Sequence, residues 1–195
     1  MFGGREKSLP GVGKPAELLR PMDHDRTLTI LYATETGSAQ DAANRIACRC
    51  RNLSFECRNI DVRDYPLVRI ISLSSDVRQN PASLSDNGNV QSDLIHETLM
   101  IFVVSTTGSG QEPRSMTTLW TMLLRSDLPN DILEDLHFTV FGLGDSSYEK
   151  FCWPAKKLSR RLVGLGATQM CHRGEGDDQH HFGFVVLHVG GSTLR

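Results

Sequence analysis

The segment 28–39, LTILYATETGSA, constrains the fold of this chain more than any other stretch. Its first part, 28–33, is an apolar run rich in branched and aromatic side chains, which is typical of a strand buried on both faces of a parallel sheet. The run ends in a turn that carries three hydroxyl side chains and one glycine. We therefore predict a strand that passes through a polar turn into a helix, because apolar residues then recur with helical spacing at Ala39, Ala42, Ala43, Ile46, Ala47 and Cys50.

The polar turn suits an anionic ligand. A helix N-terminus offers backbone N–H groups and a partial positive charge, and both favour a phosphate. The turn contains neither the lysine of a GxxxxGK[ST] nucleotide loop nor a GxGxxG dinucleotide fingerprint. It therefore indicates a single terminal phosphate held by amides and hydroxyls. The alternative is an ordinary capped helix start, because Ser and Thr are common N-caps.

Length, charge and cysteine usage bound the class of protein. A chain of 195 residues can form one domain with a sizeable core. Its net charge of -2 gives no indication of a nucleic-acid partner, and no apolar run approaches the roughly 20 residues that span a membrane. The first residues lack the apolar core of a signal peptide, so we expect a cytoplasmic protein. The five cysteines form no C-x-x-C pair, which favours reduced thiols over a metal site.

Strand and helix patterns alternate along the rest of the chain. This alternation predicts an α/β fold, a doubly wound five-stranded parallel sheet with helices on both faces. Beyond the first strand and helix, we expect strands at 55–60, 99–105, 137–143 and 167–172, and helices at 116–124 and 151–162.

Four polar loops follow strands, and in a parallel sheet they would meet at one edge, where ligands bind. This convergence favours a binding site over separately capped helices. Glycines in the loop STTGSG let the backbone approach a flat ring, and Tyr148 in the next loop suits stacking, although plain packing is its alternative role. A phosphate and a planar ring, without a second phosphate site, indicate flavin mononucleotide (FMN).

A catalytic set is not evident. Ser146 and Ser147 lack a G-x-S-x-G elbow, and the pair His180 and His181 is interpreted as solvated loop residues rather than metal ligands. This fits a redox domain in which the cofactor carries the chemistry.

The loops TETGSAQD, STTGSGQEP, FGLGDSSYEKF and GEGDDQH closely resemble the FMN domain of the NADPH-dependent diflavin oxidoreductases. The similarity is greatest to the branch that feeds electrons to cytosolic iron–sulfur protein assembly. It covers about residues 27–182, and GLGDSSYxxF followed by GDDQ is its specific part. The resemblance implies a flavodoxin-like fold, bound FMN and an iron–sulfur protein as electron acceptor. FAD and NADPH bind to other domains in that family, so this chain alone should not oxidise NADPH.

The resemblance also implies roles for individual residues. The first loop would hold the flavin phosphate, the second and third would lie against the ring with Tyr148 stacking, and Asp177 would place a negative charge near the flavin and lower its potential. The implied phosphate residues are Thr34, Glu35, Thr36, Gly37, Ser38 and Ala39, and the implied ring residues are Ser105, Thr106, Thr107, Gly108, Ser109, Gly110, Leu143, Gly144, Asp145, Ser146, Ser147, Tyr148 and Phe151.

The chain departs from the family pattern in several places. Thr107 stands where relatives often have tyrosine, so stacking would be one-sided. Residues 68–91 are expected to be a flexible insertion, because joining Leu67 to Ser92 restores the family pattern. Residues 1–26 are expected to be a disordered leader, and 183–195 an atypical tail in place of the family's last helix. Without that helix, part of one sheet face would be exposed unless the apolar tail 182–189 covers it, and this predicts a marginal fold.

Two other functions compete with an electron-transfer domain. One is a truncated, cofactor-free fragment or interaction module, and the other is a stand-alone flavodoxin-like carrier. A measurement of flavin binding distinguishes the cofactor-free fragment from the electron-transfer domain.

Overall fold

A computed structural model of the chain describes residues 26–66 and 94–179. The predicted insertion and tail, the pair His180 and His181, and all of the predicted leader except Arg26 lie outside these ranges. The expectations for those segments therefore stay predictions.

The centre of the fold is a parallel sheet with the strand order β2-β1-β3-β4-β5. Every strand pair in it is parallel, which confirms the predicted five-stranded doubly wound sheet. The strands are β1 (Thr27–Ala33), β2 (Glu56–Asp61), β3 (Leu99–Ser105), β4 (His137–Gly144) and β5 (Thr168–Gln169).

The edge beyond β4 differs from the prediction. The strand expected at 167–172 is reduced to the two residues of β5, and a further strand, β6 (Gly174–Asp177), lies in the stretch predicted as a loop. Both segments pair with β4, so together they form one interrupted edge strand. The backbone of β6 can approach β4 because Gly174 has no side chain, since a Cβ there would lie 2.5 Å from the ring of Phe141.

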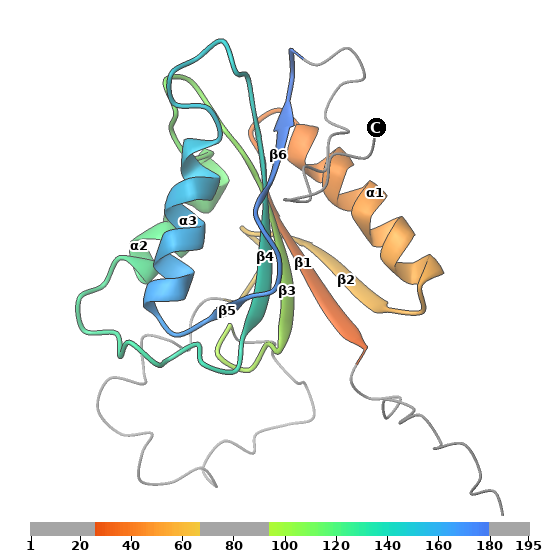
Figure 1. The fold of residues 1–195 in the computed structure, drawn as a ribbon, viewed down its shortest axis with the longest axis vertical. Coiled ribbons are helices and arrows are strands. Elements are labelled where there is room, and N and C mark those ends of the chain that lie inside the picture. The colour runs from red at the N-terminus through yellow and green to blue at the C-terminus, as the bar shows by residue number, and fades with distance from the viewer. Residues whose placement is uncertain (1–25, 67–93, 180–195) are drawn as a thin grey trace, which may run out of the picture.

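Helices cover both faces of the sheet, as predicted. Figure 1 shows α1 (Ser38–Asn52) on one side and α2 (Thr117–Leu123) and α3 (Trp153–Gly164) on the other. A short 3-10 helix, η3 (Arg114–Met116), leads into α2. The prediction that the last of these helices begins at Phe151 was wrong, because α3 starts at Trp153 with Pro154 in its first turn, where proline needs no hydrogen-bond donor.

The two faces of β1 contribute to two separate cores. Ile30 and Tyr32 pack with the α1 residues Ala39, Ala43 and Ala47, which are buried at every fourth position. These small side chains let the helix lie close to the sheet. Alternate residues of the strand point to the opposite face, as the twofold period of a strand requires.

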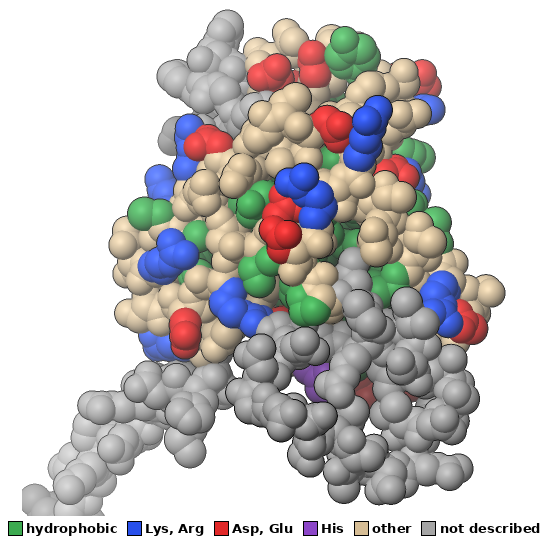
Figure 2. Space-filling model, turned by 180° about the vertical axis from the view of Figure 1, so that it is seen from behind, with side chains coloured by type: hydrophobic (Ala, Val, Ile, Leu, Met, Phe, Trp, Pro, Cys, Tyr) green, Lys and Arg blue, Asp and Glu red, His purple; other side chains and the backbone are tan. Residues whose placement is uncertain are grey.

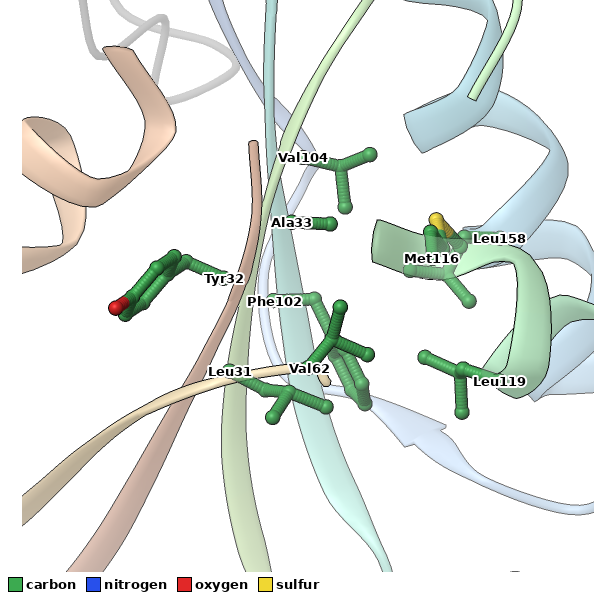
Figure 3. Close-up of a pocket in the computed structure, with 9 residues that line it drawn as sticks. All are labelled: Leu31, Tyr32, Ala33, Val62, Phe102, Val104, Met116, Leu119 and Leu158. Atoms are coloured by element: carbon green, nitrogen blue, oxygen red, sulfur yellow. The ribbon is translucent and has the colours of Figure 1, made fainter. Parts of the chain in front are cut away.

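The core beneath α2 and α3 is the larger one. The rings of Phe102 and Phe138 meet there edge to face, with centroids 6.4 Å apart. This core contains a small apolar cavity of about 10 Å³. Figure 3 shows the residues that line it, with Tyr32 pointing to the other side of β1. The cavity is about as large as one water molecule, but the residues that line it are almost all apolar. We therefore interpret it as a packing gap rather than a ligand site. Its lining residues are Leu31, Tyr32, Ala33, Val62, Phe102, Val104, Met116, Leu119 and Leu158.

A polar network is buried at the amino end of the sheet. Glu97 is only 7% exposed and forms an ion pair with Arg58 of β2. The hydroxyls of Thr29 and Tyr65 donate to the same carboxylate, at 2.8 and 3.2 Å. The carboxylate thus joins β1, β2 and the segments on both sides of residues 67–93.

We expect Glu97→Ala to lower the free energy of unfolding by about 2–3 kcal/mol, as measured by urea denaturation. Removing one partner of a fully buried ion pair costs roughly 3–5 kcal/mol, and the cost here is smaller because the Arg58 side chain is 36% exposed. Asp41→Ala is the control, because its ion pair with Arg45 is exposed on α1 and should contribute less than about 1 kcal/mol. Equal effects of the two substitutions would contradict this assignment.

We also expect deletion of 68–91, with Leu67 joined to Ser92, to leave the sheet intact. The flanking residues Tyr65 and Leu94 are both buried, and the contact between Tyr65 and Glu97 holds the two flanks together. A shorter connection also lowers the entropy cost of closing the loop. Circular dichroism should show an unchanged spectrum and an unchanged or higher melting temperature.

The matched control is a longer deletion, 68–97, which also removes Leu94 and Glu97 and should abolish cooperative unfolding. Loss of the folded spectrum in the shorter deletion would show that the removed residues contribute to the sheet.

Candidate functional site

The structure brings the four predicted loops together at the carboxyl edge of the sheet. The Thr106 N–H donates to the carbonyl of Leu143 at 2.8 Å, which joins the second and third loops. The Asp178 N–H donates to Gly144 at 2.9 Å, which joins the fourth loop to the third. These two bonds join the second, third and fourth loops, and the Ser115 hydroxyl links the first loop to the chain after the second loop through the Thr34 carbonyl.

The turn after β1 keeps the N-terminus of α1 open. Gly37 adopts φ 99°, a left-handed conformation that favours glycine, and its N–H donates to the Thr34 hydroxyl at 2.9 Å. No side chain of the described residues caps α1. Thr36 is exposed and Ser38 is half-buried, so their hydroxyls flank the uncapped amides of the first helical turn. This arrangement can receive an anion.

Glu35 connects this turn to the start of α2. Its carboxylate accepts a hydrogen bond from the Arg114 N–H at 3.0 Å and lies 3.9 Å from the Arg114 guanidinium. The Ser115 hydroxyl adds a 3.2 Å hydrogen bond to the carbonyl of Thr34. The carboxylate of Glu35 is therefore engaged by η3, and its implied contribution to a phosphate site would come from the backbone.

The second loop is a tight turn from Thr107 to Gln111. The two residues exchange backbone hydrogen bonds of 2.8 and 2.9 Å, with Gly108 at φ 46° and Gly110 at φ 89° between them. The Thr107 hydroxyl donates to the Gln111 carbonyl at 3.1 Å, so this side chain stabilises the turn itself. Ser109 lies exposed in the same turn.

Thr106 carries a hydrogen-bonding group that the described residues leave unsatisfied. Its Oγ1 is buried and lacks a partner among them. The neighbouring Ser105 hydroxyl, in contrast, donates to the carbonyl of Ala33 at 3.3 Å. A buried hydroxyl without a partner is costly, and a polar ligand at this loop is the kind of group that could satisfy it.

Two carboxylates hold the third and fourth loops against each other. Asp145 accepts hydrogen bonds from the N–H and hydroxyl of Ser147, at 2.8 and 2.6 Å, and from the Gln179 amide at 3.0 Å. Asp177 accepts from the Ser146 N–H at 2.9 Å and from the Gln179 N–H at 3.1 Å. Both acids therefore shape the loops.

The aromatic residues of the third loop differ in exposure. Tyr148 is 60% exposed, which is incompatible with the alternative role of a core-packing residue. Phe151 is half-buried, and the ammonium of Lys156 lies 5.5 Å from its ring centroid. Tyr148 is thus available at the surface beside the candidate site.

The close packing of β4 on α3 fixes where the third loop begins. A Cβ at Gly142 would lie 2.7 Å from the Cβ of Ala155 in α3. A Cβ at Gly144 would lie 3.1 Å from the Cys152 backbone nitrogen. Cys152 is fully buried at this contact, and burial raises the pKa of its thiol to about 12. The thiol therefore stays neutral and acts as a packing group.

Sequence patterns did not point to three residues that support the site. Arg114 and Ser115 bind the first loop, which is far away in the sequence, and Lys157 forms a 2.8 Å ion pair with Glu112 behind the second loop. No local pattern marks such contacts. The contact of Asp145 with Ser147 could have been found, because an Asp two residues before a polar residue is typical of an Asx turn.

A parallel five-stranded sheet with an open helix start after β1 and glycine loops after β3 and β4 defines a flavodoxin-like protein. Residues 30–182 match the family model described as Flavodoxin, so the chain belongs to the flavodoxin family. Two solved structures share the fold: a Streptococcus pneumoniae TIGR4 flavodoxin, which is 20% identical, and oxidised Flavodoxin 1 from Bacillus cereus, which is 21% identical. Each has a TM-score of 0.56, and each alignment covers 77% of this chain and 84% of the flavodoxin chain.

Curated relatives confirm the resemblance to the diflavin oxidoreductases. The protein named NADPH-dependent diflavin oxidoreductase 1 in Mycosarcoma maydis is 43% identical over an alignment that covers 81% of this chain and 20% of that protein. The protein of the same name in Bos taurus is 37% identical, and the alignment covers 80% of this chain and 22% of that protein. The Arabidopsis thaliana protein of that name is 38% identical, and the alignment covers 83% of this chain and 22% of that protein. The chain thus spans about a fifth of the length of these relatives.

Within 26–66 and 94–179, no helix has the length and apolar character needed to cross a membrane. The same residues contain no cluster of three His, Cys, Asp or Glu side chains that could hold a metal ion.

We expect the contact of Asp145 with the third and fourth loops to be lost in acid. The Ser147 side chain, with further hydrogen bonds from the Ser147 N–H and from Gln179, lowers the pKa of Asp145. A carboxyl with a lowered folded pKa stabilises the fold above its unfolded pKa of about 3.9, and the contribution disappears as pH falls through the lower folded value. Urea midpoints measured between about pH 5 and pH 2 should therefore fall less steeply in Asp145→Asn than in the wild type.

The control is Asp131→Asn, an exposed position away from these loops, which removes a carboxylate without touching the contact between them. If the urea midpoints of Asp145→Asn and the wild type fell equally between about pH 5 and pH 2, the role of this carboxylate would be contradicted.

Proposed function

We propose that this chain is an FMN-binding electron-transfer domain of a diflavin oxidoreductase. In this proposal it receives electrons from an FAD- and NADPH-binding reductase domain and passes them to a protein acceptor in cytosolic iron–sulfur cluster assembly. The observation that carries the proposal is the uncapped N-terminus of α1, preceded by a hydroxyl-rich turn and lying at the same sheet edge as two glycine-bearing loops. Membership of the flavodoxin family supports it.

The first turn fits the terminal phosphate of FMN. The site offers uncapped backbone amides, the hydroxyls of Thr36 and Ser38, and the positive end of a 15-residue helix. The negative charge of Glu35 is engaged by Arg114, which reduces its repulsion of an anion. One phosphate is what this set of donors can hold.

The second and third loops fit the flavin ring. Thr106 offers a buried hydroxyl that lacks a partner among the described residues, and the backbone at Gly108 is unobstructed, since a Cβ there would contact only the Gln111 amide at 3.9 Å. Tyr148 offers an exposed aromatic face. Bound FMN supplies transfer of one or two electrons, while the residues of the chain bind it, orient it and limit its contact with water.

Exposed charges near the loops suit a basic partner. Glu112 is paired with Lys157, and Glu175 is paired with Arg173, so both charges are partly neutralised. Glu149 and Asp178 are exposed at the loop edge and could steer an acceptor with positive charge. On the face in Figure 2, acidic and basic side chains are mixed, without a large area of one sign.

The test compares FMN with riboflavin, which lacks the phosphate, by quenching of flavin fluorescence during titration of the full chain. We expect FMN to bind at least about tenfold more tightly than riboflavin. Thr36→Asp should weaken FMN binding by about tenfold or more, equivalent to about 1.4 kcal/mol, and should change riboflavin binding little, because a carboxylate repels the phosphate.

Thr36→Ser is the matched control, since it keeps a hydroxyl and should bind FMN like the wild type. A negative charge at a helix N-terminus stabilises the helix, so unfolding would not explain weaker binding by Thr36→Asp. Equal affinities for FMN and riboflavin would contradict the phosphate site. A folded chain that binds neither would favour the cofactor-free interaction module.

A further inference from the structure

Cys50 and Cys57 lie next to each other at the junction of α1 and β2. Cys50 is in the last turn of α1 and Cys57 is the second residue of β2. Both side chains pack against the core beneath α1, and the Cys57 thiol donates to the Phe55 carbonyl at 3.6 Å. Burial and the neighbouring Cys50 side chain both raise the pKa of the Cys57 thiol, which agrees with this placement. Both are free, half-buried thiols, so a small reagent can reach them.

The backbone holds the two cysteines in this arrangement. The Phe55 N–H donates to the Cys50 carbonyl at 3.1 Å, and Ser54 reverses the chain with φ 65°. The Arg51 guanidinium donates to the Cys57 carbonyl at 3.3 Å. These hydrogen bonds hold the last turn of α1 against the start of β2, with both cysteine side chains on the same core.

The other three cysteines lack such a neighbour. Cys48 is exposed two residues earlier on α1, Cys152 is fully buried beneath β4, and Cys171 is exposed and contacts the Thr139 hydroxyl at 3.0 Å. They provide internal controls for thiol chemistry in the same chain.

We propose that Cys50 and Cys57 form a dithiol site that a low-molecular-weight disulfide oxidises to an intramolecular disulfide. One protein thiolate attacks a sulfur of the reagent, which breaks the reagent's S–S bond and releases one small thiol. The second protein thiolate then attacks this mixed disulfide, which forms the bond between Cys50 and Cys57 and releases the second small thiol. The protein loses two electrons and two protons, and the reagent is reduced to two thiols.

The surroundings affect the two steps differently. Burial raises the pKa of both thiols, which slows the first attack, while the positive charge of Arg51 acts in the opposite direction at Cys57. The second attack is intramolecular, and the packing of both side chains against the same core favours it. The new bond would close the short loop 50–57 and restrict the unfolded chain.

This site is independent of the flavin proposal. Cys57 pairs with Leu28 near the start of β1, at the amino end of the sheet, whereas the four loops follow the carboxyl ends of the strands. Oxidation can therefore be tested whether or not FMN binds.

The experiment treats the reduced chain, residues 1–195, with oxidised glutathione. Remaining thiols are then blocked with N-ethylmaleimide, and tryptic peptides are mapped by mass spectrometry. Cleavage after Arg49 and Arg51 separates Cys48, Cys50 and Cys57 into different peptides. We expect a disulfide-linked pair of peptides 50–51 and 52–58, and a melting temperature that rises on oxidation and returns after reduction with dithiothreitol.

Single cysteine-to-serine variants test which thiols form the internal disulfide. Cys50→Ser and Cys57→Ser should each leave one mixed disulfide with glutathione at the remaining cysteine, whereas Cys48→Ser should form the internal disulfide as the wild type does. The wild-type peptide map does not depend on the variants folding. The proposal is overturned if Cys50 and Cys57 both remain alkylated thiols under conditions that modify Cys48 and Cys171, or if either one pairs with Cys48.

Discussion

The parallel pairing of β1, β3 and β4 is the constraint on which the rest of this structure depends. Val104 lies opposite both Ala33 and Gly142, and Ser105 lies opposite Leu143, so the three strands end level with one another. The chain leaves each strand at the same edge, and this brings the following loops together. A shift of one residue would turn every side chain of a strand to the wrong face, so the two cores hold the register that the site requires.

Hydrogen-bonded carboxylates then fix the loops. Glu35, Asp145 and Asp177 each accept from a backbone N–H, and Glu35 and Asp177 do so across loops that are distant in the sequence. Glu97 has a comparable role at the opposite edge, where it joins β1, β2 and the chain before β3. Charged groups thus hold both ends of the sheet, while the helices are held mainly by apolar contacts. The amides of the first turn and the Thr106 hydroxyl are left for a ligand.

The two proposals assign different roles to the two ends of α1. Its first turn would hold a phosphate, and its last turn places Cys50 against Cys57. The chain spans about a fifth of the diflavin oxidoreductases that it resembles. In the proposed function a reductase domain would supply electrons and a partner would accept them, so the residues of this chain would bind and orient the cofactor that carries the chemistry.

The sequence by itself determined the central strands, α1 and the order of the loops, because long apolar runs and helical spacing are local signals of burial. It did not determine the edge beyond β4. A strand as short as β5 carries no period, and β6 forms because Gly174 fits against the ring of Phe141. Tertiary structure alone decided which groups meet in the site. Glu35 and Arg114 are 79 residues apart, and no local pattern encodes a contact that only the folded sheet creates.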